Sequence, residues 1–99
     1  MDVLTSKQRQ YLRGLAHPLA PIVRVGKAGV TDAVIAETKK SLHSHELIKV
    51  RIDSDDRKAD AEKLATATDS QIAGVVGKIA ILYRAREEKP EIELPAASA

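Results

Sequence analysis

The stretch IVRVGKAGVTDAVIAETKKSL, residues 22–42, decides the fold of this chain. It begins with the β-branched run from Ile22 to Val25, which predicts a short strand. The next four residues, Gly26-Lys27-Ala28-Gly29, stop that strand because glycines at both ends favour a tight turn. A helix is expected after the turn, with Thr31 or Asp32 as its N-cap and apolar side chains spaced along one face. A strand, a glycine turn and a helix in this order indicate a mixed α/β domain.

The residues before this stretch predict another helix. Thr5 can cap it, while Gln8, three positions later, reaches back as in a capping box. Pro18 ends the helix, because the residue before a proline avoids the α-helical conformation. Arg9 and Arg13 are four positions apart, so we expect them to share one exposed helix face.

The residues after the stretch predict a strand, a helix and a terminal hairpin. In the strand expected over residues 46–52, apolar residues alternate with Lys49 and Arg51, which indicates one buried face and one basic, partly solvated face. Residues 53–56 form a turn that leads into a helix from about Arg57 to Thr68. Two apolar runs, 72–76 and 79–84, flank Gly77-Lys78, a pair that fits a type II′ hairpin turn.

The element order is therefore α-β-α-β-α-β-β, which predicts one α/β domain with a small mixed sheet covered by helices. A length of 99 residues agrees with a single domain, which we place at residues 1–86. Residues 87–99 are acidic and then rich in proline and alanine, so we expect a mobile tail.

Composition excludes several classes of protein. The chain has no cysteine, which excludes disulfide scaffolds, thiolate metal sites and cysteine nucleophiles. No run of about 18 apolar residues predicts a membrane span, and the N-terminus lacks the basic-then-apolar order of a signal peptide. We therefore expect a soluble, cytoplasmic protein without a membrane partner.

Positive charge is concentrated in the first half of the chain. Residues 1–51 hold nine Lys and Arg against four acids, a net charge of +5, whereas residues 87–99 carry −3. This asymmetry is what a polyanion-binding face would produce. Basic residues that only solvate helix faces would produce it equally well.

The Gly26–Gly29 turn has the chemistry of a phosphate-binding loop. Two glycines allow a close backbone approach, the following helix offers free amides, and Lys27 adds a cation, as in nucleic-acid-binding GXXG loops. A tight turn with an incidental lysine is the alternative interpretation. A nucleotide-hydrolysing P-loop is excluded because the glycine spacing is too short and no Lys-Ser/Thr pair follows.

No set of catalytic or metal-binding residues is evident. Three histidines, His17, His43 and His45, could suggest a metal site. His43 and His45 diverge on a helix, and no cysteine or well-placed carboxylate completes a ligand set, so we expect helix-end histidines and no metal site. The aspartates at 53, 55, 56 and 60 read as turn and cap residues, since they lack an EF-hand pattern. No G-x-S-x-G elbow is present. We therefore predict a protein that is not an enzyme and needs no cofactor.

Four separated motifs closely resemble the YhbY family, the bacterial stand-alone form of the CRM (chloroplast RNA splicing and ribosome maturation) domain. The resemblance runs from about Leu4 to Arg84. The motifs are Leu12-Arg13-Gly14-Leu15-Ala16-His17-Pro18-Leu19, Val25-Gly26-Lys27-Ala28-Gly29-Val30-Thr31, His45-Glu46-Leu47-Ile48-Lys49-Val50, and Gly77-Lys78 with Leu82-Tyr83-Arg84.

The resemblance implies an RNA-binding domain with a four-stranded mixed sheet, similar to the C-terminal domain of translation initiation factor three. It also implies association with precursors of the large ribosomal subunit, so the expected partner is ribosomal RNA. The sequence has no pattern of a coiled coil or of a large exposed apolar stripe, so we expect a monomer. A module that docks on a ribosomal protein is the alternative, and a small phosphate-ligand or metal-dependent enzyme is disfavoured by the missing catalytic set. The predicted RNA-binding residues are Gly26, Lys27, Ala28, Gly29, Lys7, Arg9, Arg13, Arg24, Lys39 and Lys40.

Overall fold

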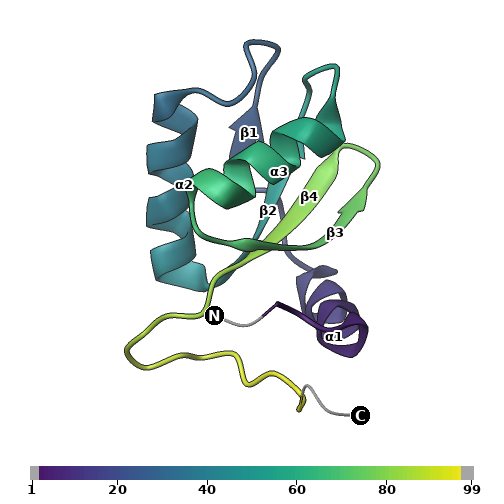
Figure 1. Ribbon diagram of the computed structural model, residues 1–99, viewed down its shortest axis with the longest axis vertical. Coiled ribbons are helices and arrows are strands. Elements are labelled where there is room, and N and C mark those ends of the chain that lie inside the picture. Colours follow the sequence, from purple (N-terminus) through teal and green to yellow (C-terminus); the bar gives the residue numbers. More distant parts are fainter. Residues whose placement is uncertain (1–2, 97–99) are drawn as a thin grey trace.

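Three helices cover a four-stranded sheet in the computed structural model of this protein, which describes residues 3–96 (Figure 1). The strand order in the sheet is β1-β2-β4-β3, and the element order is the predicted α-β-α-β-α-β-β. The elements in chain order are α1 (Ser6–Ala16), β1 (Val23–Val25), α2 (Asp32–His45), β2 (Leu47–Ile52), α3 (Arg57–Ala67), β3 (Gln71–Val76) and β4 (Ile79–Tyr83).

The sheet is mixed, as predicted. Strand β1 runs parallel to β2, while β4 is antiparallel to both β2 and β3. Gly77 has a φ of 56° in the β3–β4 turn and Lys78 has a negative φ, as a type II′ turn requires. Because of these directions, the loop after β1, the loop after β2 and the β3–β4 turn all lie at the same end of the sheet, the top in Figure 1.

Each face of the sheet carries its own apolar cluster. Helices α2 and α3 pack on one face, over residues that include Ile48, Val50 and Ile52. Helix α1 packs on the other face, over Leu47 and Tyr83. Helix α1 lies at the bottom of the view in Figure 1. The upper part of the sheet face on which α1 packs, where β1 and β2 end, therefore has no helix over it.

Local signals explain where the helices begin. The predicted capping box is present: Gln8 N–H donates to Thr5 Oγ1 at 3.1 Å and Thr5 N–H donates to Gln8 Oε1 at 3.0 Å. Thr31, not Asp32, caps α2. Glu46, which we expected to begin the second strand, instead ends α2 with a φ of 60°, and β2 begins one residue later.

The segment after β4 lies against the α1 side of the molecule. Ile92 and Leu94 pack on the α1 cluster, and Gln8 Nε2 donates to Pro95 O at 3.0 Å. The predicted mobile tail, residues 87–99, therefore has contacts with the domain up to Pro95, while residues 97–99 lie outside the described residues.

Candidate nucleic-acid interface

The Gly26–Gly29 loop is a closed turn with its tip exposed. Gly29 N–H donates to Gly26 O at 3.0 Å, so this amide closes the turn. Gly29 has a φ of 82°, a conformation that glycine adopts without strain, whereas Gly26 has an ordinary φ and open space where a side chain would be. Lys27 and Ala28 form the exposed tip. The turn thus presents one cation to solvent.

Two carboxylates lie close to this loop. Asp32 occupies the first turn of α2, where it already interacts favourably with the helix N-terminus. Asp60 Oδ2 lies 3.7 Å from the place of a Cβ on Gly29, and it accepts a hydrogen bond from Ser54 Oγ. Lys27 is thus the cation of this loop, while Asp32 and Asp60 add negative charge beside it.

The basic residues of α1 lie away from the loop. Arg9 donates to Leu4 O at 2.7 Å and to Ser6 Oγ at 3.0 Å. Arg13 donates to Ala73 O at 2.9 Å and lies across β3. These two arginines therefore stabilise α1 and its packing as well as adding charge, and Lys7 is exposed nearby. Figure 1 places α1 and the Gly26–Gly29 loop at opposite ends of the molecule.

The remaining predicted cations are on α2 and β1. Lys39 and Lys40 are exposed on α2, whose buried side holds Thr38 and Leu42. Arg24 is on β1, directly before the Gly26–Gly29 loop. The predicted residues thus form separate basic areas rather than one patch: the loop with Arg24, the exposed side of α2, and α1.

Arg24 belongs to a charged cluster that sequence reasoning did not find. Its Nε lies 2.6 Å from Asp53 Oδ2, while Arg51 Nε lies 3.0 Å and Lys78 Nζ 4.0 Å from Asp53 Oδ1. Hydrogen bonds from Arg51 and Arg24 lower the pKa of the Asp53 carboxyl. The alternation along β2 indicated that Arg51 is exposed, but only the strand order brings Lys78 to the same carboxylate.

Glu46 is a second charged residue with a role that the sequence did not indicate. Its side chain is fully buried, and its carboxylate accepts N–H groups of Arg86 at 2.9 Å, Glu91 at 2.7 Å and Ile92 at 2.9 Å. Desolvation would raise the pKa of this carboxyl, but the three backbone hydrogen bonds and the charge of Arg86 together hold it below its ordinary value. Glu46 therefore binds the chain after β4 as a carboxylate.

The two tyrosines differ in environment. Tyr83 is only 2% exposed, and its burial together with the charge of Glu46 raises the pKa of its hydroxyl. Tyr11 is 42% exposed on α1. Tyr11 is thus the tyrosine whose ring a base could reach.

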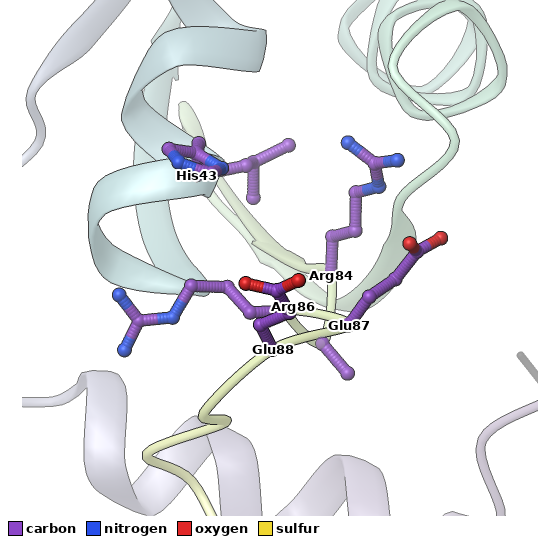
Figure 2. A pocket seen from close by; sticks show the side chains of 7 residues that line it. His43, Arg84, Arg86, Glu87 and Glu88 are labelled. Atoms are coloured by element: carbon purple, nitrogen blue, oxygen red, sulfur yellow. The ribbon is translucent and has the colours of Figure 1, made fainter.

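A pocket of about 300 Å³ lies between the end of α2 and the chain that follows β4 (Figure 2). His43, Arg84, Arg86, Glu87 and Glu88 line it, so charges of both signs meet there. Arg86 Nη2 is paired with Glu91 at 3.0 Å. Figure 2 shows Arg84 and Glu87 extending to the same side and Arg86 to the other. This mixture of charges does not form an anion site.

Across residues 3–96, no group of three or more His, Cys, Asp or Glu side chains could hold a metal ion. Over the same residues, no helix is long and apolar enough to cross a membrane.

Comparison with known proteins identifies relatives along nearly the whole chain. Residues 4–84 match the CRS1 / YhbY (CRM) domain family. "Probable RNA-binding protein YqeI" of Bacillus subtilis is 40% identical over 96 residues, which cover 94% of this chain and all of the relative. A Haemophilus influenzae protein named "RNA-binding protein" is 40% identical over 98 residues, which cover 96% of this chain and 98% of the relative.

A solved structure shows the same fold. The solution structure of SAV1595 from Staphylococcus aureus, a hypothetical protein suggested to bind RNA, is 43% identical with a TM-score of 0.83. The match covers 94% of this chain and all of SAV1595. The predicted single α/β domain is thereby confirmed, and these relatives are named for RNA binding, not as enzymes. The chain belongs to the CRS1/YhbY (CRM) domain family.

Proposed function

We propose that this protein binds RNA and acts in the assembly of the large ribosomal subunit. The observation that carries the proposal is its family membership, since relatives aligned along nearly the whole chain are named RNA-binding proteins. The exposed cations of the loop, α2 and α1 support it, because they can displace the counterions condensed on RNA phosphates. No resident cofactor is part of the proposal.

The proposed contact begins with electrostatic capture. Lys27 at the tip of the loop and the exposed pair Lys39 and Lys40 then seat the RNA backbone. Base stacking contributes little, because Tyr83 is buried and Tyr11 is the other of only two aromatic residues in the chain. Structured or double-stranded RNA, recognised by shape, therefore fits this surface better than a single strand read by its bases.

Sedimentation of the tagged protein through a sucrose gradient tests the ribosomal part of the proposal. We expect co-migration with particles lighter than the mature large subunit at low salt, and loss of that co-migration at high salt. Lys27→Glu combined with Lys39→Glu should shift the protein to the top of the gradient. Lys58→Glu combined with Lys63→Glu, at exposed positions of α3, is the matched control that should still co-migrate.

The loop glycines should be kept in such variants. An aspartate at Gly29 would be strained at a φ of 82° and would lie close to Asp60, so a loss of binding there could reflect misfolding. Migration of the unmodified protein at the top of the gradient in both salts would contradict the ribosomal role.

A protein-docking function is the second candidate, and one observation favours it. The exposed side chains of Leu15, Leu19 and Ile22 line an apolar hollow of about 390 Å³ beside Leu47 and Ile92. Apolar hollows of this kind bind apolar anchors of partner proteins. Co-migration that survives both high salt and ribonuclease would support docking on a ribosomal protein in place of RNA binding.

A further inference from the structure

The cluster around Asp53 holds more positive charge than it neutralises. Arg24, Arg51 and Lys78 share the single carboxylate of Asp53, which leaves a formal charge of +2. The cation side chains are 72%, 52% and 56% exposed, whereas that of Asp53 is 10% exposed. The carboxylate is thus covered and the cations are turned toward solvent.

The two arginines are held side by side by the sheet. Arg24 and Arg51 are register partners in the parallel β1–β2 pair, on the face opposite α2 and α3. Both approach Asp53 through Nε, and within residues 3–96 no protein acceptor is hydrogen-bonded to their Nη atoms. Two guanidinium groups with free Nη donors are suited to bidentate hydrogen bonds with phosphate oxygens.

Lys78 joins the arginines from the β3–β4 turn. Ile52 N–H donates to Lys78 O at 2.7 Å, which holds this turn against the end of β2. Asp53 N–H donates to Val25 O at 2.8 Å, which holds the loop after β2 against the end of β1. These backbone hydrogen bonds hold the segments that carry the three cations together at the end of the sheet where the Gly26–Gly29 loop also lies.

Across the sheet from Arg51, on the same face, lie apolar residues of β4 and β3, of which Val76 is exposed. Arg51 is the register partner of Ile79, and Ile79 is the register partner of Val76, which is 66% exposed. A free phosphate ion would gain nothing from such neighbours, whereas in a nucleic-acid backbone an apolar ribose face lies beside each phosphate. This face therefore fits a nucleic-acid strand better than an inorganic anion.

The acids at this end of the sheet do not cancel the cluster. Asp56 Oδ1 accepts Ala59 N–H at 3.1 Å as the cap of α3, and Asp60 accepts a hydrogen bond from Ser54. Both belong to the start of α3, which packs on the opposite face of the sheet. Asp56 and Asp60 are thus engaged in hydrogen bonds at the start of α3, and among the residues that the structure describes Asp53 is the one acid paired with the three cations.

We propose that Arg24, Arg51 and Lys78 form a phosphate-backbone site for RNA, in which Asp53 is a positioning residue that holds the arginines in place. This inference rests on the proposed RNA binding and extends it from the Gly26–Gly29 loop onto the open face of the sheet. Arg51, Lys78 and Asp53 are the residues that it adds to the predicted interface.

Fluorescence anisotropy with a labelled short RNA duplex, titrated at several salt concentrations, tests the site. Arg51→Gln combined with Lys78→Gln should weaken RNA binding about tenfold or more. The slope of the logarithm of the binding constant against the logarithm of the salt concentration should fall by the amount that corresponds to about two phosphate contacts. Lys58→Gln combined with Lys63→Gln removes the same charge from α3 and should change binding much less. Thermal melting of each variant checks that the fold is retained.

The possible outcomes separate this inference from the proposed function. If the unmodified protein binds RNA and Lys27→Gln weakens this binding, but Arg51→Gln combined with Lys78→Gln does not, the proposed phosphate-backbone site is contradicted while the proposed RNA binding stands. If the unmodified protein binds no RNA, the site and the proposed function are both contradicted. If inorganic phosphate displaces the RNA when added at the concentration of RNA phosphate groups, the site is one for free phosphate and the RNA assignment is overturned.

Asp53→Asn tests the positioning role. The change raises the net charge, so simple electrostatics would tighten RNA binding. Positioning predicts the opposite, a loss of about threefold, because the two arginines are no longer held together. Asp53→Glu, which keeps the carboxylate, should recover part of the loss. Binding of Asp53→Asn that is equal to or tighter than that of the unmodified protein would overturn the positioning role.

Discussion

At the scale of single residues, Glu46 holds the chain after β4 to the centre of the fold. Its backbone N–H donates to Leu42 O at 2.9 Å and ends α2, while its backbone carbonyl accepts Arg84 N–H at 2.9 Å beside β4. Its buried carboxylate accepts three further N–H groups. A buried carboxylate is tolerated only when its oxygens are satisfied in this way. The residue therefore couples α2 to the C-terminal segment.

Glu46→Gln should destabilise the protein by about 2 kcal/mol near neutral pH, because charge-assisted hydrogen bonds are lost and an amide group faces backbone donors. The pKa of Glu46 is lower in the folded than in the unfolded protein, so its stabilisation is present above the unfolded pKa and is lost as the pH falls through the folded pKa. The difference in free energy of unfolding between the Glu46→Gln and unmodified proteins should therefore become smaller at acidic pH. Urea unfolding of both proteins at neutral and at acidic pH measures this difference.

The control for this prediction is Glu93→Gln, a change at an exposed position of the same segment. It should leave the free energy of unfolding nearly unchanged. Equal stability of the Glu46→Gln and unmodified proteins near neutral pH would show that the carboxylate is not bound as described.

At the scale of elements, the two glycines of the Gly26–Gly29 loop have different roles. Gly29 has a φ of 82° and closes the turn, so its conformation requires glycine. Gly26 has an ordinary φ and no atom within 4 Å of a Cβ position. Its lack of a side chain is not needed for folding, which leaves close approach of a ligand backbone as the use that we propose for it.

Gly29→Ala should cost about 1–2 kcal/mol of stability, because alanine is strained at positive φ. Gly26→Ala should be nearly neutral for stability and is the matched control. Chemical denaturation of both variants measures the difference. If the two variants are equally stable, the turn does not have the described geometry. A weaker RNA affinity of the stable Gly26→Ala variant would agree with close backbone approach.

At the scale of the whole molecule, the C-terminal segment completes the α1 side of the fold. Ile92 and Leu94 pack on the cluster that contains Leu47 and Tyr83, and Gln8 binds Pro95 O. The acidic segment thus lies on the α1 side, while the Asp53 cluster and the Gly26–Gly29 loop are at the other end of the sheet. In this arrangement its negative charge is kept away from the Gly26–Gly29 loop and the Asp53 cluster, although it lies beside the cations of α1.

Deletion of residues 87–99 tests the domain boundary that the sequence predicts. We expect residues 1–86 to fold, because all helices and strands are retained, but to be less stable by at least about 2 kcal/mol. Two hydrogen bonds to Glu46 and the cover over Leu47 would be lost. Circular dichroism and urea unfolding measure fold and stability. Unchanged stability would show that the tail is mobile and adds nothing to the domain.

Short-range patterns were sufficient to predict the elements. The Thr5–Gln8 capping box, the alternation along β2 and the Gly77 turn each depend on residues a few positions apart, and all three are present in the structure. The mixed sheet followed from the α-β-α-β-α-β-β order. The boundary at Glu46 was misjudged, because a glutamate before an apolar run looks like a strand residue unless its buried partners are known.

The sequence by itself thus determined the elements, their order and the exposed position of Lys27, because hydrogen bonding between near neighbours and side-chain periodicity decide these features. Only the tertiary structure decided which distant charges meet. The strand order brings Arg24, Arg51 and Lys78 to Asp53, and the packing of α1 separates its own cations from the loop. The physical reason is that such encounters depend on strand pairing and helix packing between residues far apart in the chain, which local patterns do not encode.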